Sequence, residues 1–411
     1  MNQTKEKKDK DSASPSQDEP AASTSTSVAS LSSKLADTAL LDMVFVMDCT
    51  GSMGSYIHSA QQTIHDLVQE IVSKEKADVR FALVAYRDHP PQDCSYVTQV
   101  YEFSSSVKNM RDNLNQLSAS GGGDGPEAVV DGLHAALKLD FRPAATKVAI
   151  LIADAPPHGL GQSGDGFPEG CPCGLDPLAV CRDMAQHGIT LYCIGCEPSL
   201  SPYKTFFMAL CHITGGQYCP LGDATNLHAA VVGGVREEIS LERMMKEVNT
   251  TLESCSAGMD ETAKALRVQS VLKQKGYRTS HLRSDRGESC AILPKALEIL
   301  SSPDLAHVRA HHAKDIGDAM RARMSPASLH RHAPPMALSA CVATADAGRL
   351  MRKSREVGDG ERSGTGAPHD LFASRTTTTA ASGSYSVVED DVSVMQCERM
   401  MAKAAARSKR A

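Results

Sequence analysis

An apolar run ends in an acidic residue and is followed at once by two hydroxyl side chains. The segment VFVMDCTGSMG contains Asp48, Thr50 and Ser52 at alternate positions, with glycines between and after the two hydroxyl residues. Alternate side chains on a bend can turn toward one centre, and glycine lets the backbone pass close to an ion. Carboxylate and hydroxyl oxygens are selected by hard cations such as Mg²⁺, whereas Zn²⁺ favours His or Cys. This segment therefore predicts part of a Mg²⁺ or Mn²⁺ site.

Two further loops supply acidic residues. Residues 118–127 read SASGGGDGPE and contain Asp124, while residues 152–159 read IADAPPHG and contain Asp154. Because ligands of open parallel sheets bind outside the carboxyl ends of the strands, we expect the three loops to meet in one crevice. The alternative is that the acids are solvated loop residues or helix caps. The predicted metal ligands are Asp48, Thr50, Ser52, Asp124 and Asp154.

The elements that position these loops alternate between short apolar runs and segments with helical periodicity. Strands that are apolar throughout indicate a sheet covered on both faces, so we predict a doubly wound, Rossmann-like, mostly parallel α/β fold. A short connection between the second and third strands favours a hairpin. Strands are expected at 41–47, 79–86, 95–103, 147–153, 189–196 and 216–221, and helices at 55–74, 105–117, 126–138, 176–187, 202–213 and 223–235.

The three loops resemble the metal-ion-dependent adhesion site of von Willebrand factor A (vWA) domains. The motifs DCTGSMG, SGGGDGPEA and ADAPPHG carry the resemblance, and YRDHPPQD and GDGFPEGCP are most similar to the intracellular A domains that accompany α-type protein kinases. The resemblance covers roughly residues 40–240. It implies a six-stranded sheet with one antiparallel edge strand. It also implies a cation with one position open to a partner's carboxylate.

One position departs from the usual vWA pattern. Asp124 stands where many A domains have Thr, and a third carboxylate would make the metal site net negative. Such an ion would attract an acidic partner less strongly. The sequence therefore leaves open whether the ion binds a partner or only stabilises the fold.

The charge of the chain is unevenly distributed. Residues 41–235 carry 21 acidic and 11 basic side chains, whereas residues 276–411 carry 15 acidic and 20 basic ones. The N-terminal segment lacks the apolar region of a secretory signal, and no apolar stretch has the length of a membrane helix, so we expect a cytoplasmic protein with 13 reduced cysteines. The expected organisation is a disordered arm at 1–38, a vWA domain at 39–235, a helix at 236–275, and a mostly disordered basic tail with a short C-terminal helix at 276–411.

The predicted helix at 236–275 contains a seven-residue apolar spacing. A seam of this kind favours a coiled-coil homodimer, but Gly258 interrupts it, and the alternative is an amphipathic helix packed on its own domain. The seam would contain Leu241, Met245, Val248, Leu252, Cys255, Met259 and Leu266.

Several other signals are weaker. GLGQSG at 159–164 lacks the strand–turn–helix context of a dinucleotide site. His89 and His158 lie on loops at the metal face, but no nucleophile or second acid–base group accompanies them. A zinc site is conceivable among the clustered cysteines, which we interpret instead as small buried side chains. These are Cys171, Cys173, Cys181, Cys193, Cys196, Cys211 and Cys219.

Together these features predict an intracellular Mg²⁺-dependent vWA interaction or scaffold module that binds a protein partner through its metal site. The alternative is a regulatory or targeting component linked to an α-type protein kinase, which acts on a kinase in trans or carries weak phosphotransfer itself. We expect no kinase catalytic domain, because residues 276–411 offer no second large core. The charges of this tail are interleaved, so nucleic-acid binding is not expected.

Overall fold

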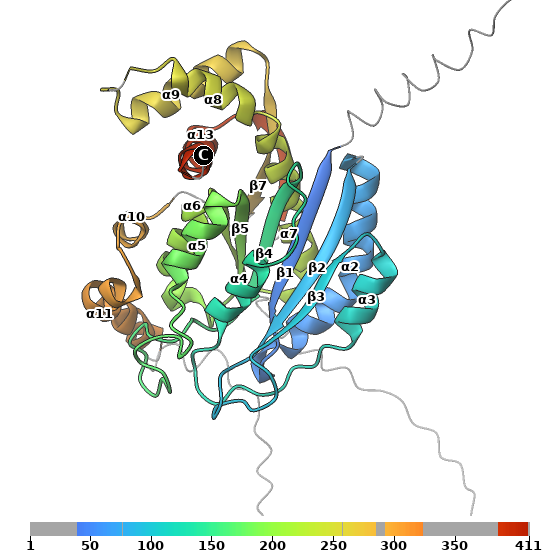
Figure 1. Ribbon diagram of the computed structural model, residues 1–411, viewed down its shortest axis with the longest axis vertical. Coiled ribbons are helices and arrows are strands. Elements are labelled where there is room, and N and C mark those ends of the chain that lie inside the picture. Colours follow the sequence, from blue (N-terminus) through green and yellow to red (C-terminus); the bar gives the residue numbers. More distant parts are fainter. Residues whose placement is uncertain (1–38, 76, 257, 285–291, 324–384, 410–411) are drawn as a thin grey trace, which may run out of the picture.

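The computed structural model describes residues 39–75, 77–256, 258–284, 292–323 and 385–409. These residues form one central sheet with helices on both of its faces (Figure 1). The arm predicted at residues 1–38 lies outside the described residues, as does the 324–384 part of the predicted tail. None of the helices described has the length and apolar character needed to cross a bilayer.

The central sheet has six strands in the order β3-β2-β1-β4-β5-β6. All neighbouring pairs are parallel except β2 and β3, which form the predicted antiparallel hairpin at one edge. The predicted vWA-type sheet is therefore confirmed. Its strands are β1 (Leu40–Asp48), β2 (Asp78–Tyr86), β3 (Thr98–Ser104), β4 (Thr146–Ala153), β5 (Ile189–Cys196) and β6 (Gln217–Leu221).

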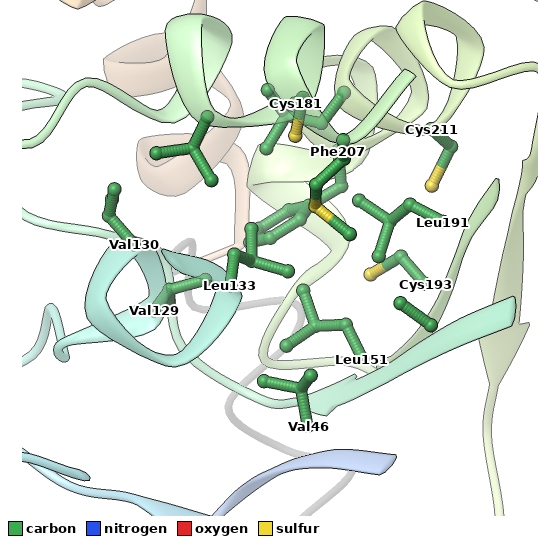
Figure 2. Close-up of a cluster of buried hydrophobic side chains, with 14 of the residues drawn as sticks. Val46, Val129, Val130, Leu133, Leu151, Cys181, Leu191, Cys193, Phe207 and Cys211 are labelled. Carbon is green, nitrogen blue, oxygen red and sulfur yellow. The ribbon is translucent and has the colours of Figure 1, made fainter. Parts of the chain in front are cut away.

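Helices cover both faces of the sheet because its inner strands are apolar on both sides. On one face, Phe45 of β1 belongs to a core shared with α2, α3 and α7. On the other, Val46 and Leu151 face Leu133 and Phe207, which come from α4 and α6 (Figure 2). The helices are α2 (Gly54–Glu75), α3 (Val107–Asn115), α4 (Val129–Leu137), α5 (Pro177–Gln186), α6 (Lys204–Ile213) and α7 (Leu227–Glu242).

The prediction of a single helix at 236–275 is wrong. The chain instead forms the end of α7, then α8 (Met245–Glu253) and α9 (Glu261–Gln274). The side chain of Asp260 accepts a hydrogen bond from the Ala263 amide at 2.8 Å and so caps a new helix where the seam required continuity. Leu266, a predicted seam residue, is 51% exposed. The heptad spacing therefore does not form a continuous surface for the predicted homodimer.

The apolar side of α8 and α9 packs against the C-terminal helix α13 (Val394–Ser408). This helix confirms the short C-terminal helix expected from the sequence, and Ser393 and Gln396 form a capping box at its start. Met400 of α13 is fully buried beside Val248 of α8 and Val268 of α9. Much of the predicted intermolecular seam is thus covered within the same chain.

The described parts of the tail form more structure than the predicted disorder allows. Strands β7 (Arg278–Ser284) and β8 (Tyr385–Asp391) form an antiparallel pair beside α7. Helix α10 (Pro294–Leu300) packs on α6, and α11 (Leu305–Arg323) begins near the long loop after β4. Ile299 and Val308 are buried in the core of the α4–α6 face. These segments are ordered because they add apolar side chains to the domain.

Candidate metal centre

Asp48 ends β1 at the carboxyl edge of the sheet and is completely buried. Its Oδ1 accepts hydrogen bonds from the amide of Thr50 at 2.9 Å and from the hydroxyl of Thr50 at 2.7 Å. The Thr50 hydroxyl lies 3.5 Å from that of Ser52, whose side chain also hydrogen-bonds with Asp154 at the end of β4. The structure therefore brings together four of the five predicted metal ligands.

This group contains buried carboxylate oxygens that lack partners. Among the described residues, Asp48 Oδ2, Asp154 Oδ1 and Glu127 Oε2 are buried and receive no hydrogen bond. A buried polar atom without a partner is costly, and more so when it carries charge. Ser52, in contrast, is exposed to solvent. The donor set consists of oxygens and opens at one side, so it fits a hard divalent cation.

The raised pKa values of these carboxyl groups indicate that their charged forms lack a nearby positive charge. Burial, together with the nearby charge of Asp154, raises the pKa of Asp48 to about 7. Burial and the surrounding acids, Asp48 foremost, raise the pKa of Glu127 to about 10. Burial also raises the pKa of Asp154. Without a cation the site therefore retains protons, which a bound metal would displace.

Glu127 was not among the predicted ligands. Its backbone amide donates to the carbonyl of Pro156 at 2.9 Å, which holds the second loop against the third. Gly122 has a φ of +79°, and a Cβ there would lie 2.6 Å from Glu127 Oε1 and 3.3 Å from the Thr50 Cβ. Glycine thus permits Glu127 to approach the first loop. Its position after Pro126, in the same glycine-rich loop as Asp124, is the signal that could have identified it.

The structure places Asp124 in a different group. Its Oδ2 accepts a hydrogen bond from the Gly166 amide at 2.5 Å, and its carboxylate lies within 4.8 Å of ligand atoms of Asp88 and His158. His158 is buried, and its two ring nitrogens lie 2.7 Å from Asp88 Oδ1 and 2.7 Å from Asp165 Oδ1. Although burial lowers it, these two carboxylates raise the pKa of His158 above its ordinary value. The hydrogen bond of Asp124 and the ligand atoms near its carboxylate therefore belong to this histidine group, while its Oδ1 is buried and receives no hydrogen bond.

The fold and the loop that contains Asp48, Thr50 and Ser52 define a class of α/β domain with a candidate cation site at the carboxyl ends of its strands. Residues 42–159 match the model of the von Willebrand factor A domain family. This segment of the chain is therefore a vWA domain.

Two curated relatives share part of this chain. The alpha-protein kinase vwkA of Dictyostelium discoideum is 32% identical over 155 residues, which are 37% of this chain and 24% of the relative. The putative ariadne-like RING finger protein R811 of Acanthamoeba polyphaga mimivirus is 30% identical over 185 residues, which are 44% of this chain and 18% of the relative. The chain thus spans a quarter or less of the length of these relatives. Among solved structures, a von Willebrand factor type A protein from Catenulispora acidiphila is 17% identical, with a TM-score of 0.37 over 49% of this chain and 43% of that one.

Proposed function

We propose that this chain is a cytoplasmic interaction or scaffold module that binds one Mg²⁺ or Mn²⁺ and, through it, an acidic side chain of a protein partner. vWA domains are modules generally involved in protein interactions. The observation that carries the proposal is the set of unpartnered carboxylate oxygens on Asp48 and Asp154, which lie buried next to the exposed Ser52. A cation held there would be reachable from solvent on the Ser52 side.

In this proposal, Asp48, Thr50, Ser52 and Asp154 hold the ion, and Glu127 takes the place that the sequence suggested for Asp124. The bound cation supplies the positive charge that these buried acids lack. In this proposal Glu127 faces the cation as a neutral carboxyl group, so that the ionised Asp48 and Asp154 balance the two positive charges of the ion. A nearly neutral centre can still accept a partner's carboxylate at an open position.

The affinity for Mg²⁺ will increase with pH. Asp48 has a pKa of about 7 in the metal-free protein, so it is largely protonated below that pH and must lose its proton to bind the cation. We expect the apparent affinity to rise about fivefold or more from pH 6 to pH 8, with release of protons. Calorimetry in buffers of different ionisation enthalpy measures both quantities. An affinity that does not change with pH would contradict the assigned role of Asp48.

Capture of a protein partner will depend on the cation and on Asp48. The immobilised chain is compared with its Asp48→Asn and Asp124→Asn variants, each in Mg²⁺ and in EDTA. Partners that need the metal will bind the wild-type chain and Asp124→Asn in Mg²⁺ alone, and will not bind Asp48→Asn. Asp124→Asn is a matched control because an amide oxygen can still accept the Gly166 hydrogen bond. Capture of the same partners by all three proteins in EDTA at the level seen in Mg²⁺ would overturn a metal-dependent interaction.

A second candidate function is a regulatory or targeting component that acts with an α-type protein kinase. The observation that favours it is the 32% identity with part of a protein described as an alpha-protein kinase. In this case the chain would bind a kinase catalytic domain and change its activity or its choice of substrate. Binding and phosphorylation rates measured with a purified α-type kinase domain, with and without this chain, separate the two candidates. Phosphotransfer by the purified chain alone would contradict both.

A further inference from the structure

A second cluster of side chains that can bind a metal differs in chemistry from the carboxylate group of Asp48, Glu127 and Asp154. His89, Asp131, Cys171 and Cys173 each place a nitrogen, oxygen or sulfur atom within 4.8 Å of the others. The Nε2 of His89 lies 2.9 Å from Asp131 Oδ2, and the Sγ of Cys171 lies 3.2 Å from the same oxygen. The Cys171 Sγ and His89 Nε2 are 3.7 Å apart. One nitrogen, one oxygen and two sulfurs therefore converge on one point.

These side chains come from three separate segments. His89 lies in the connection between β2 and β3, Asp131 lies in the first turn of α4, and both cysteines lie in the loop between β4 and α5. His89 and Asp131 are buried, Cys171 is half-buried, and Cys173 is exposed. The cluster is thus closed toward the protein and has an entry path at Cys173.

Two backbone N–H groups are directed at the sulfur of Cys171. The amide of Cys173 donates to the Cys171 Sγ at 3.3 Å, and the amide of Leu175 donates to the same sulfur. Gly170 and Gly174, with φ values of +110° and +74°, flank the Cys-Pro-Cys segment and allow its tight turn. Burial outweighs these N–H groups and raises the pKa of the Cys171 thiol to about 12, so a bound metal would displace its proton.

The spacing of the ligand atoms also suits a tetrahedral ion. Zinc bonds of about 2.3 Å to sulfur and about 2.0–2.1 Å to nitrogen or oxygen place neighbouring ligand atoms about 3.3–3.8 Å apart in a tetrahedral site. The separations among His89, Asp131 and Cys171 are 2.9, 3.2 and 3.7 Å, so these three need shifts of only a few tenths of an ångström to bind the ion. The Cys173 sulfur lies within 4.8 Å of all three ligand atoms. Phe167 packs edge-on against the His89 ring at 5.6 Å between centroids and shields this side.

We propose that His89, Asp131, Cys171 and Cys173 form a structural Zn²⁺ site. Two thiolates, an imidazole and a carboxylate are typical zinc ligands, and four protein ligands leave no open position for a substrate. The ion would fasten the long loop after β4 to α4 and to the β2–β3 connection. This loop also carries His158 and Asp165, so the zinc would fix the histidine group that contacts Asp124. The proposal does not depend on a cation at Asp48.

The test measures zinc in the full chain purified without chelators. Elemental analysis will give one zinc per wild-type chain, and Cys171→Ser and Cys173→Ser will each contain almost none. Cys94→Ser is the matched control, because Cys94 is an exposed thiol in the same β2–β3 connection, and this variant will keep its zinc. Asp48→Asn will also keep it, which separates this site from the proposed Mg²⁺ site. Zinc in both cysteine variants at the wild-type level would overturn the proposal.

A spectroscopic measurement on the wild-type chain keeps the test decisive if a cysteine variant does not fold. The zinc is removed with a chelator under reducing conditions and replaced by Co²⁺. A tetrahedral site with two thiolates will give sulfur-to-cobalt charge-transfer bands and strong visible bands that saturate at one equivalent, and added Zn²⁺ will abolish them. A folded chain that shows no such bands would overturn the proposal. Bands that persist unchanged in Cys171→Ser would do so as well.

Discussion

Replacing Arg399 with alanine will lower the free energy of unfolding by about 3–5 kcal/mol, because it leaves buried carboxylates without their counter-ion. Arg399 of α13 is only 2% exposed, and its Nη1 lies 3.0 Å from Glu237 Oε2. Its Nε donates to the carbonyl of Gly215 at 2.9 Å, and its Nη2 donates to the Tyr192 hydroxyl at 2.6 Å. One guanidinium therefore joins the C-terminal helix to α7, to β5 and to the turn before β6.

Denaturant unfolding at neutral pH measures this loss. The control is Lys275→Ala, which removes a half-exposed lysine that lies 2.6 Å from Glu247, and we expect it to change the free energy of unfolding by less than about 1 kcal/mol. The difference between the two variants is the effect of burial on an ion pair. Equal stability of Arg399→Ala and the wild-type chain would show that α13 is not held in the described position.

Two further basic residues of α13 form ion pairs with acidic residues of α7. Lys403 pairs with Glu238 and lies 3.2 Å from Glu242, and Arg407 binds both oxygens of Glu242 at 2.7 and 3.0 Å. Despite burial, these two cations lower the pKa of Glu242 to about 2. Its contribution to stability is complete above the pKa of about 4.5 in the unfolded chain and is lost as the pH falls toward 2. The basic residues that appeared in the sequence as a solvated tail thus serve as partners for α7.

The central sheet could be predicted because its signals are local. Each inner strand is a short apolar run, and the strands at 41–47 and 147–153 end in an acid at the position where the chain leaves the sheet. The hairpin at the sheet edge follows from a short connection between two such runs. These features depend on neighbours in the sequence, and the structure reproduces them within a few residues.

The C-terminal half could not be predicted in the same way. The apolar stripe of α8 and α9 was visible, but its partner, α13, lies more than a hundred residues further along the chain. A seven-residue spacing cannot distinguish a second copy of the chain from a distant segment of the same chain. The local signal that breaks the seam, Asp260 as a helix cap after Gly258, was present but carries less weight than the apolar pattern.

The candidate sites also differ in whether their residues lie close together in the sequence or only in the fold. Asp48, Thr50 and Ser52 occupy one short segment, so their grouping was readable from the sequence. The choice between Asp124 and Glu127 depends on the path of a glycine-rich loop, which residue types alone do not fix. The cysteines of the Cys-Pro-Cys segment were noticed, but their partners His89 and Asp131 come from other loops and become neighbours only in the fold.

Mg²⁺ will stabilise the wild-type chain and will not stabilise Asp48→Asn. At about 100 times its dissociation constant, a cation that binds only the folded state adds about 2.7 kcal/mol to the free energy of unfolding. Without Mg²⁺, at pH 7.5, the variant will be at least as stable as the wild type. Burial raises the pKa of Asp48 from its ordinary value of 3.8 to about 7, so the wild type loses stability as the pH rises from about 4 to 7. At pH 7.5 this loss is complete, and asparagine does not incur it.

Asp48→Asn is therefore expected to lose the stabilisation by Mg²⁺ and yet to be at least as stable as the wild type without the ion. A variant that simply folds poorly would not give this combination. Thermal or denaturant unfolding of both proteins, with Mg²⁺ and with EDTA, measures them together. Asp124→Asn will respond to Mg²⁺ as the wild type does, since the described contacts of Asp124 are with Gly166 and the histidine group. Stabilisation of Asp48→Asn by Mg²⁺ equal to that of the wild type would place the cation elsewhere. A lower stability of the metal-free variant would instead show that Asp48 holds the loop through its hydrogen bonds with Thr50 more strongly than its buried charge opposes folding.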